Sequence, residues 1–176
     1  MLPNQYWYPV KDGDPRVFAL MKRHYSFQSY ADGRRSNPSY RNRNLVVGPG
    51  EKCVYLTVDC LATWAWRKFL DDSGQEGICN AFFHNEGPIR SSSLILEACT
   101  LAWQRWPGQR LYTYVDARAI QSPNPGYCFK LAGWKLVRND KGKPLLTGSG
   151  KLILEKLCPD SNAQPVGKSM TGSQPN

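Results

Sequence analysis

Residues 78–116, ICNAFFHNEGPIRSSSLILEACTLAWQRWPGQRLYTYVD, contain the pattern that decides the fold. The two ends, 78–85 and 110–116, are short apolar runs typical of strands. Between them, apolar residues recur at helical spacing and predict one long amphipathic helix. A serine of the run 91–93 is expected to cap this helix, and Pro107-Gly108 to end it. The apolar stripe of the helix comprises Leu94, Ile95, Ala98, Leu101, Ala102 and Arg105.

Strand, helix and strand in this order predict a right-handed crossover. Turn signals and hydrophobic periodicity predict the remaining helices and strands before and after this crossover in the sequence. Upstream we expect a helix over 16–30, starting after Pro15, then strands over 53–57 and 60–69 and a hairpin at Ser73-Gly74. Downstream we expect a short helix over 126–133, closed by Gly133, and a strand pair over 134–137 and 150–157.

The sequence therefore predicts an α+β fold with a mixed, mostly antiparallel sheet flanked by helices. Residues 1–158 are expected to form a single domain that includes a basic loop at about 31–44. Residues 159–176 are polar and rich in Pro, Gly and Ser, so a disordered tail is expected there.

Composition and charge narrow the class of protein. The 176 residues are 41% hydrophobic and 12% aromatic, as in a chain that folds around a core. The net charge of +9 is consistent with simple solubility or with an anionic partner, such as nucleic acid or a phosphorylated cofactor. The six cysteines show no CxxC pair and no metal-ligand spacing, and no apolar run has membrane length. We therefore expect a cytoplasmic protein with no membrane association.

The turn that leads into the long helix carries hydrogen-bond donors. Arg90, Ser91, Ser92 and Ser93 precede or open the helix, where free backbone N–H groups and the helix dipole favour an anion. The alternative is that these serines are ordinary helix caps.

The order of elements, together with NPGYCFKLAGWK at 124–135, resembles the GNAT N-acyltransferases. This resemblance implies that the turn holds the pyrophosphate of acetyl-CoA or a related CoA thioester and that Asn124 lies beside the donor. Two features depart from the family pattern. If Arg90 opens the pyrophosphate signature, Ser93 and Ile95 stand where small residues such as glycine are usual, and Phe129 stands where many members have an acid tyrosine.

A narrower group, the phage proteins related to Mom, is similar over most of the chain up to about residue 157. The resemblance rests on RHYS, VDCLATWAWRKF, NEGP, RWPGQRLYTYVD and NPGYCFKLAGW. It implies a phage-type anti-restriction enzyme that adds a methylcarbamoyl (acetamido) group to the N6 amine of adenine in double-stranded DNA. It also implies a catalytic set made up of His24, Tyr25, Asp116 and Tyr127.

These residue types suit that chemistry. The unperturbed imidazole pKa of about 6.5 lets His24 move a proton near neutrality. Asp116 is expected to orient that imidazole or to accept the proton of the adenine amine, and Tyr127 to donate a hydrogen bond or act as an acid. Tyr25 is expected to stack on a base flipped out of the duplex. His84 is the substitute base.

The basic loop is the expected contact to DNA. Arg34, Arg35, Arg41 and Arg43 are suited to phosphates, and such contacts make binding salt-dependent. Two other functions remain open at this point: acetyl-CoA-dependent N-acetylation of a small amine or modified nucleotide, and a non-catalytic DNA-binding anti-restriction role. A metal requirement and the choice between monomer and homodimer stay open as well.

Overall fold

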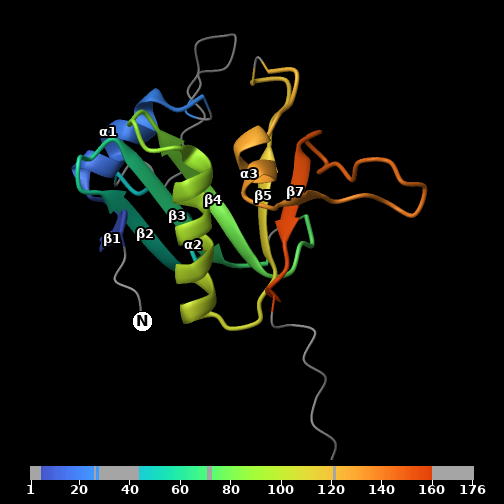
Figure 1. Cartoon of the computed structure of the whole chain (residues 1–176), viewed down its shortest axis with the longest axis horizontal. Helices are drawn as coiled ribbons and strands as arrows, with labels where there is room; N and C mark the ends of the chain where they lie inside the picture. Colours follow the sequence, from blue (N-terminus) through green and yellow to red (C-terminus); the bar gives the residue numbers. More distant parts are fainter. Residues whose placement is uncertain (1–4, 26, 28–43, 71–72, 121, 160–176) are drawn as a thin grey trace, which may run out of the picture.

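The computed structural model describes residues 5–25, 27, 44–70, 73–120 and 122–159. In this part of the chain a seven-stranded sheet in the order β1-β2-β3-β4-β5-β7-β6 carries three helices (Figure 1). All neighbouring strands are antiparallel except β4 and β5. The predicted α+β class with a mostly antiparallel sheet is therefore confirmed. The elements are β1 (Trp7–Val10), α1 (Pro15–Arg23), β2 (Glu51–Thr57), β3 (Ala62–Lys68), β4 (Ile78–Asn85), α2 (Ser91–Arg105), β5 (Leu111–Val115), α3 (Tyr127–Leu131), β6 (Lys135–Leu136) and β7 (Leu152–Lys156).

The predicted crossover is formed by β4, α2 and β5, and it produces the central feature of the sheet. The two parallel strands pair only at their first residues, from Ile78–Leu111 to Asn80–Thr113. Both strands then continue, to Asn85 and Val115, with no further pairing between them among the described residues. The sheet is therefore split between β4 and β5 on the side where both strands end.

The helices cover opposite faces of the sheet. Val17, Leu20 and Met21 of α1 belong to one buried cluster, which also holds Phe82 of β4. The other face packs against α2 and α3 through a tryptophan-rich cluster. Two of its indoles donate to backbone carbonyls of α2: Trp7 Nε1 to Leu94 O at 2.8 Å and Trp66 Nε1 to Ala98 O at 3.1 Å.

A bulge in β4 lies beside the split. The β3–β4 register passes from Ala65–Phe82 to Trp66–Asn80, which leaves Ala81 as the extra residue. A bulge re-aims side chains and bends its strand. Phe82 and Phe83, which follow the bulge, alternate as in a regular strand: Phe82 faces α1, and Phe83 packs in the cluster of the opposite face.

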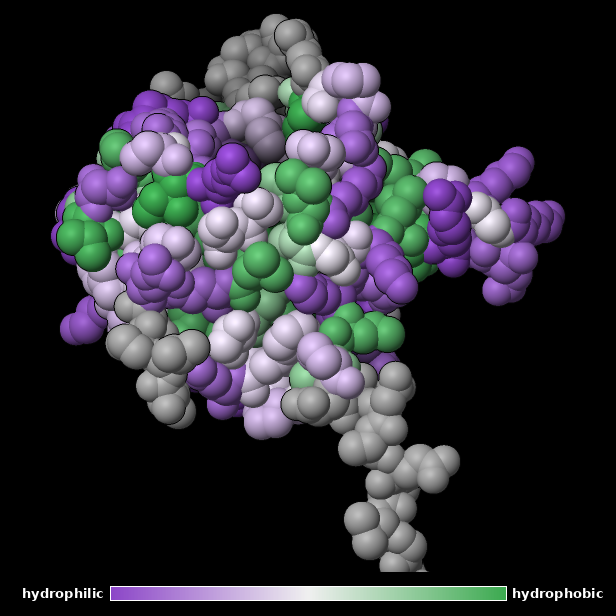
Figure 2. Space-filling view, in the orientation of Figure 1, coloured by the Kyte–Doolittle hydropathy of each residue, from purple (hydrophilic) through white to green (hydrophobic). Residues whose placement is uncertain are grey.

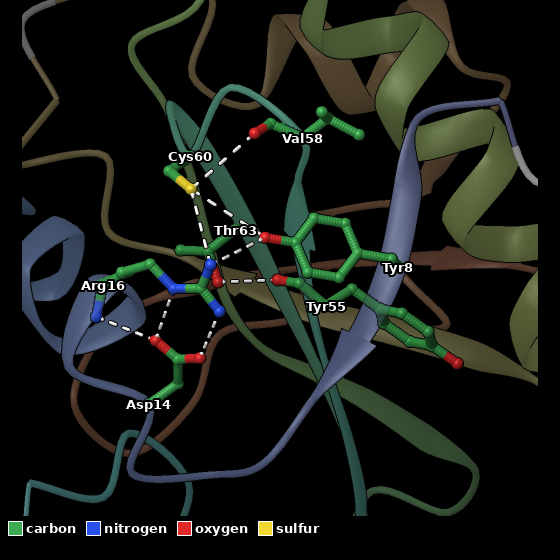
Figure 3. A network of polar contacts seen from close by, with 7 residues as sticks. All are labelled: Tyr8, Asp14, Arg16, Tyr55, Val58, Cys60 and Thr63. Atoms are coloured by element: carbon green, nitrogen blue, oxygen red, sulfur yellow. Dashed lines mark hydrogen bonds and ion pairs between the residues drawn. The ribbon is translucent and has the colours of Figure 1, made fainter.

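The start of α1 is fixed to the sheet by the polar network in Figure 3. The Asp14 carboxylate caps the helix by accepting from Arg16 N at 2.9 Å, and it pairs with the Arg16 guanidinium at 2.7 Å. Arg16 Nη1 also lies 3.3 Å from the Tyr8 hydroxyl oxygen and 3.9 Å from Cys60 Sγ. This network sets the direction in which α1 leads to His24.

Three sequence predictions need correction. The first helix is shorter than expected, because His24 adopts extended backbone (φ −75°, ψ 142°) and ends it after Arg23. No serine caps α2: its N-cap residue is Arg90, without a side-chain cap bond, and the serines form the first turn. Arg105 does not belong to the buried stripe, since it is exposed and pairs with Glu51 at 2.9 Å.

The N-terminal strand β1 was not predicted. Its edge is held by the Glu97 carboxylate of α2, which accepts from Tyr6 N at 3.0 Å and Trp7 N at 3.1 Å. This long-range contact has no local signature in the sequence. In the described ranges, no helix has the length and apolar character needed to cross a membrane.

Candidate functional site

A cavity of about 780 Å³ opens where β4 and β5 separate. Its walls come from the end of α1, both strands, the loop after β5 and the start of α3. The lining residues are His24, Tyr25, Cys79, Asn80, Ala81, Phe82, Phe83, Thr113, Tyr114, Val115, Asp116, Ala119, Ile120, Ser122, Asn124, Gly126, Tyr127, Cys128, Phe129 and Lys151.

All four residues predicted as the catalytic set line this one cavity. His24 and Tyr25 follow α1, Asp116 follows β5, and Tyr127 is the first residue of α3. The fold thus brings the segments around residues 24 and 120 together at the split in the sheet. The cavity reaches both faces, because its lining includes Phe82 from the α1 side and Phe129 from the α3 side.

The His24 imidazole is held by aromatic packing. The centroid of its ring lies 4.2 Å from the centroid of the Tyr25 ring, with an angle of 36° between the two ring planes. It lies 4.9 Å from the centroid of the Phe82 ring, in an edge-on contact. The imidazole of His84 lies 5.5 Å away, also edge-on. The two histidines of the chain are therefore neighbours, although His84 does not line the cavity.

An ion-pair network supports His84 from the side of the β4–α2 turn. Glu86 Oε1 lies 2.7 Å from His84 Nε2, and the carboxylate receives two bonds from Arg23, at 2.6 and 2.8 Å. The Arg23 and His84 bonds lower the Glu86 pKa to about 2. Because an ionised carboxylate only accepts hydrogen bonds, His84 Nε2 is the donor of this pair.

Replacing Glu86 by glutamine is expected to make the free energy of unfolding depend less steeply on pH in the acid range. The depressed Glu86 pKa means that its stabilising contribution is complete above the unfolded pKa of about 4.3 and is lost as the pH falls towards 2. The stability gap between wild type and Glu86→Gln should therefore narrow from pH 5 to pH 2 in urea titrations. A gap that stays constant over this range would contradict the assignment.

Tyr25 and Asp116 are close neighbours in the cavity wall. Burial raises the pKa of Tyr25, and a hydrogen bond to the Asp116 backbone opposes this shift. Hydrogen bonding to Arg118 lowers the pKa of Asp116, whose Oδ1 lies 3.1 Å from Arg118 Nε. A carboxylate with a lowered pKa is a weak base, so Asp116 is better suited to hold Tyr25 and the loop than to take a proton.

The α3 side of the cavity combines one exposed phenol with apolar groups. The Tyr127 side chain is accessible, since the residue is 56% exposed. Burial raises the pKa of the adjacent Cys128 thiol, which keeps the thiol protonated at neutral pH. Phe129 is buried, and its ring centroid lies 5.1 Å from that of Trp134 and 6.0 Å from that of Trp64. Tyr127 therefore supplies an accessible hydroxyl donor on this wall.

The predicted cofactor residues do not gather in the cavity. Asn124 lines it and accepts a hydrogen bond from Lys130. Arg90, Ser91, Ser92 and Ser93 are absent from its lining, and Ser91 Oγ already accepts from Asn85 Nδ2 at 3.0 Å. Among the described lining residues, Lys151 is the one lysine or arginine. These groups do not fit a diphosphate within the cavity, and its aromatic and amide walls fit a neutral planar group better.

Sequence reasoning missed the polar residues at the closed end of the split. Asn80 is buried, donates to Phe82 O at 2.9 Å and Ala65 O at 3.2 Å, and thereby satisfies carbonyls beside the bulge. Thr113 Oγ1 donates to Asn80 Oδ1 at 3.1 Å across the parallel pair. An asparagine inside an otherwise apolar strand was the available signal, because a buried amide needs partners.

The four arginines predicted to contact DNA, Arg34, Arg35, Arg41 and Arg43, lie outside the described residues. Within the ranges that the structure describes, no three His, Cys, Asp or Glu side chains are grouped to hold a metal ion. Comparison with protein-family models, curated proteins and solved structures finds no match for the chain.

Proposed function

We propose that the protein modifies the N6 amine of adenine in double-stranded DNA by adding a methylcarbamoyl group, and so protects the DNA from restriction. The observation that carries this proposal is the convergence of His24, Tyr25, Asp116 and Tyr127 on one cavity. The Mom-like resemblance implies these four residues from separate motifs, and the fold that the chain adopts gives them a common site.

The cavity suits an extruded base. An enzyme that acts on a base in duplex DNA must take it out of the stack and hold it between aromatic or apolar side chains. Tyr25 and Phe83 supply such surfaces, and the Tyr127 phenol supplies a hydrogen-bonding group at the accessible wall. The 780 Å³ volume falls in the range typical of small-molecule sites.

His24 is assigned as the proton acceptor. As the adenine N6 nitrogen attacks the electrophilic carbon of an activated donor of this group, the N–C bond forms and the donor's leaving group departs with its bonding electrons. The N6 proton then passes to the His24 imidazole. Tyr25 and Phe82 hold that ring in place, and Asp116 fixes the loop on which the Tyr25 hydroxyl rests.

A panel of restriction enzymes tests the function. Plasmid DNA from cells that express the protein should resist enzymes whose sites contain adenine. Enzymes whose sites hold only G and C should cleave the same DNA fully, because those sites contain no target amine. Complete cleavage by every enzyme of a broad panel would overturn the proposal. Equal resistance in both groups would point instead to protection by bound protein, which removal of protein from the DNA would abolish.

A further inference from the structure

The segment between β6 and β7, residues 137–151, forms an arm that extends from the sheet edge. Figure 1 shows this orange segment reaching away from the body of the molecule, and Figure 2 shows hydrophilic surface over its outer part. The C-terminal end of the arm lies beside the cavity: Lys151 lines the cavity wall, and Ser149 O accepts a hydrogen bond from Arg118 Nη2 at 2.8 Å. Arg118 also pairs with Asp116, so one side chain ties the arm to the site.

Two tight turns give the arm a defined shape. In the first, Gly142 N donates to Asn139 O at 2.9 Å, and Asn139 Oδ1 accepts from Lys141 N and Lys143 N, both at 3.0 Å. Gly142 adopts the left-handed φ of +72° that closes such a turn. The second turn is closed by Gly150 N donating to Thr147 O at 2.8 Å. Both turns of the arm are therefore closed by hydrogen bonds within the arm itself.

The charge at the first turn is strongly positive. Arg138, Lys141 and Lys143 are exposed there within six residues, against the single acid Asp140. Arg138 Nη1 donates one hydrogen bond to Gly142 O at 2.7 Å, whereas Lys141 and Lys143 take part in the hydrogen bonds of this turn through backbone groups. Arginine and lysine side chains are common contacts to the phosphates of a nucleic acid.

We infer that this arm binds the phosphate backbone of duplex DNA next to the base that enters the cavity. The inference rests on the proposed function, since a cavity that takes a flipped base needs the flanking duplex held at its mouth. A narrow hairpin ribbon also fits the major groove, which admits a two-stranded β-ribbon. The arm thus supplies a DNA contact separate from the arginine-rich loop.

The test compares two double variants with equal loss of charge. Lys141→Gln/Lys143→Gln removes the two exposed lysines of the first turn of the arm, and Lys11→Gln/Lys68→Gln removes two exposed lysines elsewhere, with Lys11 next to the opposite edge strand β1. Binding to a fluorescent duplex is measured by anisotropy over a series of salt concentrations. The arm variant should bind more weakly, and its slope of log K against log salt should fall by about 1.8, or about 0.9 for each lost phosphate contact. The control variant should keep the wild-type slope.

Equal slopes for the wild type and the arm variant would overturn the inference, and so would an equal loss in both double variants. An identical loss on single-stranded DNA of the same length would overturn the assignment to duplex. The binding assay does not require modification of adenine. The role of the arm and the proposed function are therefore tested separately. Modified adenine together with an unchanged slope would contradict the arm alone, and a reduced slope without modified adenine would contradict the proposed function alone.

Discussion

Replacement of His24 by phenylalanine is expected to lower the yield of modified adenine in plasmid DNA by at least about 100-fold, the lower end of what a general base contributes. Phenylalanine keeps a planar ring for the contacts with Tyr25 and Phe82 and removes both nitrogen atoms. The variant should therefore fold and bind DNA like the wild type. The yield is measured by mass spectrometry of nucleosides from cells with matched expression.

The contrast with His84 sharpens this prediction. His84 lies 5.5 Å from His24 but outside the cavity lining, so His84→Phe should reduce the yield far less. If His24→Phe retains the wild-type yield and His84→Phe loses it, the base is His84 and the assignment is wrong. A non-catalytic protein would give full protection from restriction with either variant.

Gly77→Ala is expected to destabilise the fold by about 3 kcal/mol, through backbone strain and overpacking together. Gly77 has a φ of +119°, which side-chain-bearing residues rarely adopt, and an added Cβ would lie 2.3 Å from Arg110 O. Arg110 O also accepts from Ile78 N at 2.8 Å where β4 and β5 begin to pair. The substitution therefore forces apart the short parallel contact below the cavity.

Gly74→Ala is the matched control in the same turn. Gly74 also has a left-handed φ, +68°, but no atom of the described residues beyond its chain neighbours lies within 4 Å of an added Cβ. Its expected cost is about 1 kcal/mol, from the backbone conformation alone. Urea denaturation measures both free energies of unfolding. Equal losses would show that the close approach to Arg110 does not constrain the fold.

The central part of the fold could be predicted because its signals are local. The apolar stripe of α2 and the runs on both sides of it define the crossover, and the predicted strand 78–85 coincides with β4. The pair over 134–137 and 150–157 is confirmed as β6 and β7. Strand β1 escaped prediction because its order depends on pairing with β2 and on Glu97, which lies about 90 residues away along the chain.

The four residues that the family resemblance implies lie in one cavity, but the sequence does not show how that cavity is built. His24, Tyr25, Asp116 and Tyr127 were proposed from motifs, and they share the cavity. The split that creates the cavity depends on where the β4–β5 pairing stops, which no sequence pattern encodes. The Arg118 bond that weakens Asp116 as a base is a matter of side-chain geometry, and so is the contact between the two histidines.

The central claim is that the cavity modifies adenine, and analysis of the DNA itself tests it most directly. Plasmid DNA from cells expressing the wild-type protein is digested to nucleosides, purified from protein and analysed by mass spectrometry. We predict a fifth nucleoside, a deoxyadenosine that carries one methylcarbamoyl group, and we expect it to disappear with His24→Phe. DNA that contains only the four ordinary nucleosides, at an expression level that gives folded protein, would contradict it.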